Sequence, residues 1–263
     1  MFFPPTPFHF GDLLRCAELV ETAYDMCSQW GDQGHCRDSS FIWQPKGPSD
    51  LDYSAPLWGA ATFLRFFKNH SPFAFLANDG QGTAYLVFRG TQTPSDGLED
   101  LHASQTNYTL VDAFGDAHEG FVEIYESISP HVRAALERLP DSTQRLLVTG
   151  HSLGSALSTL AIPDVLHNSR FGPKDIVHYN LASPRVASIP FADAYQATGV
   201  PTYRVVNSAD VVPQLPPPIL GPDTFRHVGV QLTFSVNHGS VEANHSSKGS
   251  YLAALDSLRT PGS

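Results

Sequence analysis

The fold of this chain is decided by the stretch Leu146-Leu147-Val148-Thr149-Gly150-His151-Ser152-Leu153-Gly154-Ser155-Ala156. It reads as a short apolar strand, the pattern G-x-S-x-G and then the start of a helix. A sharp turn from strand to helix requires small residues beside its apex, and Gly150 and Gly154 meet that requirement. The pattern alone also arises by chance, so the flanking strand and helix make it informative.

The turn predicts a reactive serine. Ser152 is expected at the carboxyl edge of a sheet, in front of a helix N-terminus where free N–H groups and the helix dipole favour negative charge. A serine in this place can attack an acyl carbonyl, and the backbone N–H of Leu153 can bind the oxyanion that forms.

Length and charge restrict the remaining possibilities. The 263 residues suit one α/β domain over residues 1–263, without a dividing linker. A net charge of −10 argues against nucleic acid and anionic membrane surfaces as partners. The longest apolar patch, residues 57–67, contains Arg65 and is too short to span a bilayer, so no transmembrane segment is expected.

Strands are expected to alternate with helices, which predicts a mostly parallel sheet flanked by helices, with the chemistry at the carboxyl ends of the strands. Besides the strand before Ser152, the strands are expected at 73–77, 83–88, 176–181, 202–206 and 228–234. The helices are expected at 12–29 with a cap at Gly11-Asp12, at 119–139 with a kink or break at Pro130, after Ser152 with an end or bend near Pro163, and at 191–197 and 249–258. The five prolines of residues 213–222 predict an extended loop.

A serine nucleophile needs a histidine base, and the base needs a carboxylate that orients it. Asp210 is the downstream acid that follows directly on an apolar strand, although a turn aspartate would look the same. Three later histidines are candidates for the base: His227, which opens a strand, His238 in a turn, and His245 on a loop before a helix.

Several motifs in order resemble the class 3 lipases, the family of fungal triacylglycerol lipases and their bacterial relatives. They are Phe88-Arg89-Gly90-Thr91, His118-Glu119-Gly120-Phe121, the stretch around Ser152, Ser183-Pro184-Arg185-Val186, residues 204–213, and His245 followed by Tyr251. The resemblance covers roughly residues 60–256. It implies an α/β-hydrolase-type fold with Ser152 as nucleophile, Asp210 as acid and His245 as base, with His238 as the alternative. It also implies a second oxyanion donor at Thr91. His118 is expected to be a hydrogen-bonded structural residue.

The chain departs from the family pattern at three places. Ser155 and Ala182 stand where the family has glycine, and both are small. Residues 92–106 correspond to the family's lid, but Gly97 replaces its large apolar anchor, and Leu98 and Leu101 are nearly its only large apolar side chains. Because two leucines contribute only a few kcal/mol at about 25 cal/mol per Å², we expect weak interfacial activation and a preference for short to medium acyl chains. The walls of the acyl pocket are predicted at Leu215, Ile219, Leu220 and Phe225.

The predicted function is a serine carboxylic-ester hydrolase of lipase type. Its expected partner is a small-molecule or lipid ester, with transient contact to a lipid interface. The alternatives are a feruloyl or other aryl esterase, a phospholipase A1, a thioesterase, or a non-catalytic module on the same scaffold. The chain has no H-E-x-x-H and no paired cysteine–histidine spacing, so neither metal nor cofactor is expected.

The compartment is predicted from weaker signals. The chain has an odd number of cysteines, Cys16, Cys27 and Cys36, and begins without a signal-peptide pattern. Both features favour free thiols in the cytoplasm. Asn244-His245-Ser246 matches a glycosylation site, and a glycan there would crowd the predicted site at His245. Passage through a glycosylating pathway is therefore not expected. The alternative is a secreted protein whose leader has been removed.

Overall fold

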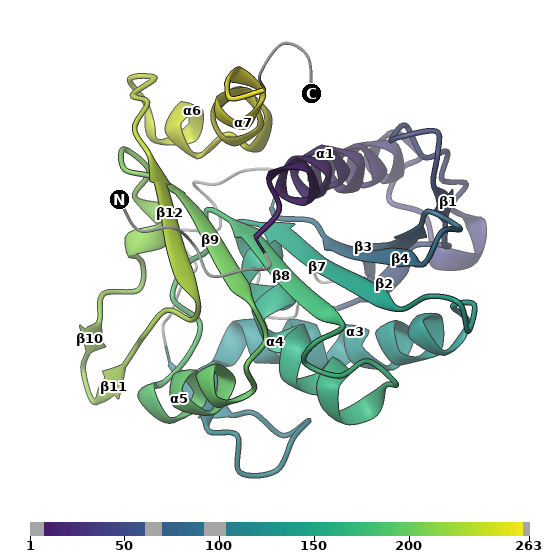
Figure 1. The fold of residues 1–263 in the computed structure, drawn as a ribbon. Coiled ribbons are helices and arrows are strands. Elements are labelled where there is room, and N and C mark those ends of the chain that lie inside the picture. The colour runs from purple at the N-terminus through teal and green to yellow at the C-terminus, as the bar shows by residue number, and fades with distance from the viewer. Residues whose placement is uncertain (1–7, 61–69, 92–103, 260–263) are drawn as a thin grey trace.

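The computed structural model describes residues 8–60, 70–91 and 104–259, and its centre is an eight-stranded sheet (Figure 1). In spatial order the strands are β1 (Asp52–Tyr53), β3 (Ser71–Asn78), β4 (Thr83–Phe88), β7 (Arg145–His151), β8 (Ile176–Leu181), β9 (Thr202–Asn207) and β12 (Val230–Phe234), and β2 (Leu57–Gly59) also pairs with β3. Two hairpins lie outside this sheet: β5 (Gln105–Asn107) with β6 (Asp116–His118), and β10 (Ile219–Leu220) with β11 (Asp223–Thr224).

Within the eight-stranded sheet, β4, β7, β8, β9 and β12 are parallel to one another. In contrast, β1, β2 and β3 are antiparallel to their neighbours. The register pairs Phe88 with Gly150, and Gly150 with Asn180, so the carboxyl ends of β4, β7 and β8 lie side by side. The expectation of a mostly parallel sheet is confirmed.

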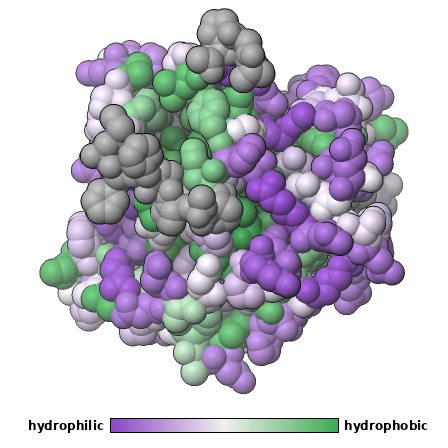
Figure 2. Space-filling model, viewed as in Figure 1, coloured by the Kyte–Doolittle hydropathy of each residue, from purple (hydrophilic) through white to green (hydrophobic). Residues whose placement is uncertain are grey.

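Helices cover both faces of the sheet (Figure 1). One face carries α3 (Glu119–Glu137) and α4 (Leu153–Asn168), and α5 (Ile189–Ala197) lies at the same side, near the hairpin β5–β6. The other face carries α1 (Phe10–Asp32) and the C-terminal elements α6 (Val241–His245), η3 (Ser247–Leu252) and α7 (Ala253–Ser257). Figure 2 shows the molecule from the same side: hydrophilic residues dominate the right of this face, and apolar residues gather between the C-terminal helices and α1.

Two apolar cores result from the alternation of side chains along the strands. In β7, Leu146 and Val148 belong to the core under α3 and α4, whereas Leu147 belongs to the core under α1. All three side chains are fully buried. A strand that is buried on both faces reads as a continuous apolar run, which is the signal seen in the sequence before Ser152.

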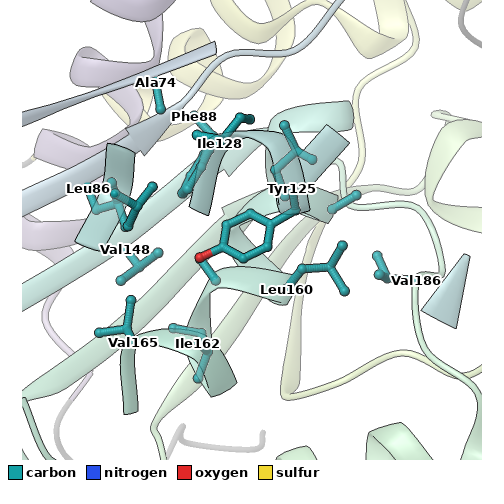
Figure 3. Close-up of a cluster of buried hydrophobic side chains, with 14 of the residues drawn as sticks. Ala74, Leu86, Phe88, Tyr125, Ile128, Val148, Leu160, Ile162, Val165 and Val186 are labelled. Carbon is teal, nitrogen blue, oxygen red and sulfur yellow. The ribbon is translucent and has the colours of Figure 1, made fainter. Parts of the chain in front are cut away.

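A polar group is buried between α3 and α4. The Asp164 carboxylate, which is 0% exposed, accepts hydrogen bonds from the Tyr125 hydroxyl at 2.8 Å and from Arg133 Nε at 2.9 Å. Asn168 donates a further bond at 2.8 Å. Figure 3 shows Tyr125 among the surrounding apolar side chains of the core under α3 and α4. These hydrogen bonds compensate for the hydration that the carboxylate loses on burial.

Several element boundaries differ from the expectation. Helix α1 begins at Phe10 with His9 as its N-cap, and Asp12 lies in its first turn, where it pairs with Arg145. Helix α3 runs through Pro130, and the Ser129 hydroxyl donates to the Glu126 carbonyl that the proline leaves without its N–H donor. Helix α4 likewise continues past Pro163.

The C-terminal third also differs in detail. Residues 213–222 do not form one extended loop, because they include part of the 3-10 turn Val212–Gln214 and the first strand of the hairpin β10–β11. The last strand begins at Val230 because Gly229, at φ +72°, turns the chain into it. The helix predicted at 249–258 is a π-helical turn from Ser247 that continues into α7.

The contact between α3 and α4 generates a prediction about stability. Replacing Asp164 by Ala removes the acceptor of Tyr125 and Arg133, and we expect the free energy of unfolding in urea to fall by about 2–3 kcal/mol. The loss stays at the low end because Arg133 is 33% exposed and regains water. Asp193→Ala breaks an ion pair whose carboxylate is 66% exposed and is the control, with an expected change of about 0.5 kcal/mol or less. Equal losses in the two variants would contradict this account.

Candidate active site

The turn at Ser152 has the conformation that the sequence predicts. Ser152 lies between β7 and α4 at φ 58° and ψ −126°, a left-handed backbone that is strained for a serine. A Cβ on Gly150 would lie 2.2 Å from the Gly154 carbonyl oxygen, and a Cβ on Gly154 would lie 2.3 Å from the Phe88 carbonyl oxygen. Only glycine allows strand and helix to approach this closely.

Ser155, which stands where the family has a glycine, strengthens the same turn. Its hydroxyl lies 2.6 Å from the carbonyl oxygens of Gly150 and Leu181, and it accepts a hydrogen bond from the Leu181 N–H at 3.1 Å. The side chain therefore ties the first turn of α4 to the ends of β7 and β8. Ala182, the other departure, has φ 53°, a conformation that glycine adopts at lower cost.

Three side chains from distant parts of the chain meet at this turn. His245 Nε2 lies 2.8 Å from Ser152 Oγ, and His245 Nδ1 lies 2.7 Å from Asp210 Oδ2. Ser152 is 7% exposed, and His245 and Asp210 are 1% exposed. A proton can pass from the hydroxyl to the imidazole, while the carboxylate fixes the ring orientation and stabilises the cation that forms.

The Asp210 carboxylate is held by more than the histidine. Its Oδ1 accepts the Val212 N–H at 3.0 Å, and its Oδ2 accepts the Tyr251 hydroxyl at 2.7 Å. Burial and the nearby carboxylate raise the pKa of Tyr251 well above its ordinary value, so the phenol keeps its proton and remains a donor. Asp210 lies three residues after β9, where the sequence places it. His245, in contrast, is the last residue of the short helix α6 and does not lie on a loop.

The other two candidate histidines lie in different surroundings. His238 is exposed, in the turn beside Gly239, and its backbone N–H donates to Asn244 Oδ1 at 2.6 Å. His227 Nε2 lies 2.8 Å from the Pro213 carbonyl oxygen. Of the three, His245 is the one that the structure places against both Ser152 and Asp210.

The segment after β4 runs beside the turn. Thr91, 9% exposed, follows Gly90, where a Cβ would lie 3.2 Å from the Ser152 Cβ. The buried Arg89 donates from Nη1 to the Gly90 carbonyl at 2.9 Å and from Nε to the Pro72 carbonyl at 2.6 Å, which anchors the segment. Leu153 is the first residue of α4, so its N–H has no partner within the helix. The end of β4 and the N-terminus of α4 therefore both lie beside Ser152.

The sequence reading missed two residues next to the site. His151 is 2% exposed, its ring centroid lies 4.7 Å from that of His245, and its Nδ1 lies 2.8 Å from the Tyr24 hydroxyl. Burial lowers the pKa of His151 well below its ordinary value, and the proximity of His245 lowers it further. The imidazole of His151 therefore stays neutral. The sole sequence signal for His151 is its position next to Ser152, and Tyr24 has the pattern of any core residue of an amphipathic helix.

His118 is not the hydrogen-bonded residue that was expected. It is fully buried and stacks on Phe121 with ring centroids 4.2 Å apart, but within the described chain neither of its ring nitrogens has a hydrogen-bond partner. Because the charged form is penalised by burial, the pKa of His118 falls to about 4. Its ring fills apolar space, and packing explains it better than polar contacts do.

The predicted acyl-pocket residues do not share one environment. Phe225 is buried, Leu215 is half-buried, and Ile219 and Leu220 are 72% and 40% exposed in the hairpin β10–β11. Their assignment to a pocket stays a prediction. Leu98 and Leu101 lie outside the described residues, as does most of the predicted lid at 92–106.

Two further properties concern the described residues alone. Among them, no group of three or more His, Cys, Asp or Glu side chains is placed to hold a metal ion. None of the helices they form has the length and apolar character needed to cross a membrane.

Comparisons with known proteins point to one family. The family described as Lipase (class 3) matches residues 85–219, which include Thr91, Ser152 and Asp210 but end before His245. A lipase of Rhizopus niveus is 36% identical over 161 residues, 59% of this chain and 40% of that protein. A secreted mono- and diacylglycerol lipase of Fusarium solani is 34% identical over 158 residues, and phospholipase A1-II 4 of rice is 30% identical over 182 residues.

The matched stretches span less than half of these relatives, 45% for the Fusarium protein and 43% for the rice protein. The crystal structure of a lipase from Rhizopus microsporus var. chinensis superposes with a TM-score of 0.67 and 27% identity, and covers 88% of this chain and 76% of that one. This likeness confirms the α/β-hydrolase-type fold.

The buried imidazole of His118 generates a prediction about pH. Its pKa is lowered from 6.5 to about 4, so between these values the unfolded chain binds a proton that the folded chain does not. The contribution of the neutral His118 to the free energy of unfolding is therefore complete above pH 6.5 and falls as the pH drops. Between pH 8 and pH 5 this residue accounts for a loss of about 2 kcal/mol. In His118→Leu this part of the loss should disappear from urea unfolding curves. The exposed His131→Leu is the control, and identical pH dependence in both variants would refute the assignment.

Proposed function

We propose that this chain, which belongs to the class 3 lipase family, is a serine carboxylic-ester hydrolase of lipase type. The observation that carries the proposal is the hydrogen-bonded row of Ser152, His245 and Asp210 in front of the N-terminus of α4. A row of this kind activates a hydroxyl for attack on an acyl carbon, and the neighbouring backbone donors suit the oxyanion of that reaction.

Each residue has one role in the proposed reaction. Ser152 Oγ attacks the ester carbonyl, and His245 Nε2 takes the hydroxyl proton, while Asp210 holds Nδ1–H and stabilises the imidazolium. The backbone N–H groups of Thr91 and Leu153 bind the oxygen that becomes negative. His245 then protonates the departing alcohol, which leaves the acyl group on Ser152. A water molecule, deprotonated by His245, releases the acid by the same steps in reverse.

The proposed substrates are acylglycerols and related esters with short to medium acyl chains. Relatives named as a lipase and as a mono- and diacylglycerol lipase support the acylglycerol class. The chain-length preference rests on the sequence of the predicted lid, where Leu98 and Leu101 are nearly the only large apolar side chains. A lid with little apolar surface gains little free energy at a lipid interface, so we expect only transient contact with it.

A phospholipase A1 activity is the second candidate, because a relative carrying that name matches 58% of this chain. Feruloyl or aryl ester hydrolysis follows only from the scaffold, which does not fix the substrate. Tributyrin, a phosphatidylcholine labelled at the sn-1 chain, and ethyl ferulate, compared at equal enzyme concentration, separate the three.

The compartment remains a proposal as well. Cys16, Cys27 and Cys36 are free thiols, which is compatible with the predicted cytoplasmic location. The Fusarium relative is named as secreted, which supports the alternative of a secreted chain.

Substitutions in the catalytic row test the proposal directly. Ser152→Ala and His245→Ala should each lower kcat on p-nitrophenyl butyrate by about 10⁴-fold, because either change removes proton transfer from the nucleophile. A fluorophosphonate probe should label the wild type and not Ser152→Ala. His238→Ala, in an exposed turn, is the matched control and should keep its activity within about twofold.

Two results would contradict this assignment. An active His245→Ala beside an inactive His238→Ala would move the base to His238. A wild type that neither hydrolyses esters nor reacts with the probe would favour a non-catalytic module on the lipase scaffold.

The chain-length preference has its own test. We expect the rate on p-nitrophenyl esters from C2 to C18 to peak at a short or medium chain and to change little as the substrate passes its solubility limit. A steep rise at the emulsion boundary together with an optimum at C16 would refute the weak interfacial activation inferred from the lid.

A further inference from the structure

Helix α1 reaches the active site through Tyr24. The Tyr24 hydroxyl lies 2.8 Å from Nδ1 of His151, the residue directly before Ser152. The two rings meet edge to face, with centroids 5.9 Å apart. Tyr24 comes from more than one hundred residues earlier in the chain, and the proposed reaction assigns it no step. Its contact with the turn at Ser152 therefore calls for another explanation.

The same hydroxyl also contacts the segment that carries Thr91. Burial raises the pKa of Tyr24, and the adjacent backbone of Gly90 partly offsets this effect. A Cβ on Gly90 would lie 2.2 Å from this hydroxyl oxygen and 2.8 Å from the His151 carbonyl oxygen. The absence of a side chain at Gly90 thus makes room for the phenol between two backbone segments.

We propose that Tyr24 is a positioning residue that fixes the segment Gly90–Thr91 relative to the turn His151–Ser152. This inference rests on the proposed ester hydrolysis and deepens it. The hydroxyl hydrogen-bonds His151 Nδ1 at 2.8 Å and lies against Gly90, so it contacts both the residue before Ser152 and the residue before Thr91. The distance between the Thr91 N–H and Ser152 Oγ is then set by a side chain that touches neither substrate nor product.

This distance matters because oxyanion donors act by being in place before the charge develops. A donor that drifts by about 1 Å can cost about 10²-fold in rate. Thr91 is followed directly by the predicted lid, whereas Gly90 on its other side is held by Arg89 at its carbonyl and by contact with the Tyr24 hydroxyl. Without the phenol, one of these two attachments is lost.

The bridge adds no charge beside the base. Burial lowers the pKa of His151 and raises that of Tyr24, so both groups stay neutral at ordinary pH. A cationic His151, with its ring centroid 4.7 Å from that of His245, would oppose formation of the His245 imidazolium during the reaction. A phenol is suited to this place because it donates and accepts without a charge.

Helix α1 is also fixed to the segment that carries the base. One turn before Tyr24, the Glu21 carboxylate accepts a hydrogen bond from the Ser247 hydroxyl, two residues after His245. One face of α1 therefore touches all three segments that deliver the nucleophile, the oxyanion donor and the base.

The test is deletion of one hydroxyl. Tyr24→Phe keeps the ring, and we expect kcat on p-nitrophenyl butyrate to fall by about 10- to 100-fold while KM stays within about threefold. The inhibition constant of a trifluoromethyl ketone, which forms an oxyanion on the serine, should rise by a similar factor. Tyr85→Phe is the matched control: this tyrosine belongs to the same core under α1, is 8% exposed, and should leave both values within about twofold.

A second variant keeps the result interpretable if Tyr24→Phe loses its fold. His151→Leu removes the other end of the bridge and should lower kcat to a similar degree. The double variant should be no slower than the slower single one, because both changes break the same bridge. Unchanged kcat and inhibition constant in Tyr24→Phe, equal losses in Tyr85→Phe, or additive losses in the double variant would each overturn the positioning role. An inactive and unlabelled wild type would overturn the proposed function, and this inference with it.

Discussion

The structure depends on how closely the backbone of α4 approaches β7 and β4 at Ser152. Glycine at positions 150 and 154 makes this possible, since a Cβ at either position would lie within 2.3 Å of a backbone carbonyl oxygen. The close approach forces Ser152 to a positive φ, and that conformation turns its side chain away from the sheet. The same approach brings the end of β4, and with it Thr91, beside the serine. One steric constraint therefore sets both the proposed nucleophile and the place of its proposed oxyanion donor.

The other half of the site is joined to this turn by buried polar contacts rather than by sequence proximity. Asn207, at the end of β9, donates from its side chain to the carbonyls of Val236 and Asn244 and accepts the Ala209 N–H. Its backbone N–H donates to the Tyr251 hydroxyl, which itself donates to Asp210. The segments that carry Asp210 and His245 are thus held by a common amide. A buried network of this kind fixes geometry because each unsatisfied member would cost free energy.

The sequence predicts features whose interacting residues lie close together in the chain, and it does not predict those whose residues lie far apart. The parallel sheet and the turn at Ser152 follow from local signals, since an apolar run, two glycines and a helix are neighbours in the chain. Asp210 follows from its place after a strand, but the choice among His227, His238 and His245 depended on family resemblance, because it requires the fold of the last thirty residues. Tyr24 lies on no recognisable motif, and the contacts of Asn207 do not follow from the motif at residues 204–213, because both sets of contacts form only when distant segments meet. The predicted break at Pro130 is wrong, because α3 continues through it and a neighbouring serine donates to the carbonyl that the proline leaves open.

The charges around the site follow from the same contacts. Asp210 is 1% exposed, and its carboxylate is compensated by three donors: His245 Nδ1–H, the Tyr251 hydroxyl and the Val212 N–H. The other buried groups at hand, His151 and Tyr24, are neutral. The imidazolium of His245 would therefore meet one desolvated carboxylate and no competing cation among these groups, and in a medium of low dielectric this pairing is stronger than in water. A serine at a strained turn is suited to act as a nucleophile when its proton has a single favourable destination, and the contact of Ser152 with His245 provides that destination.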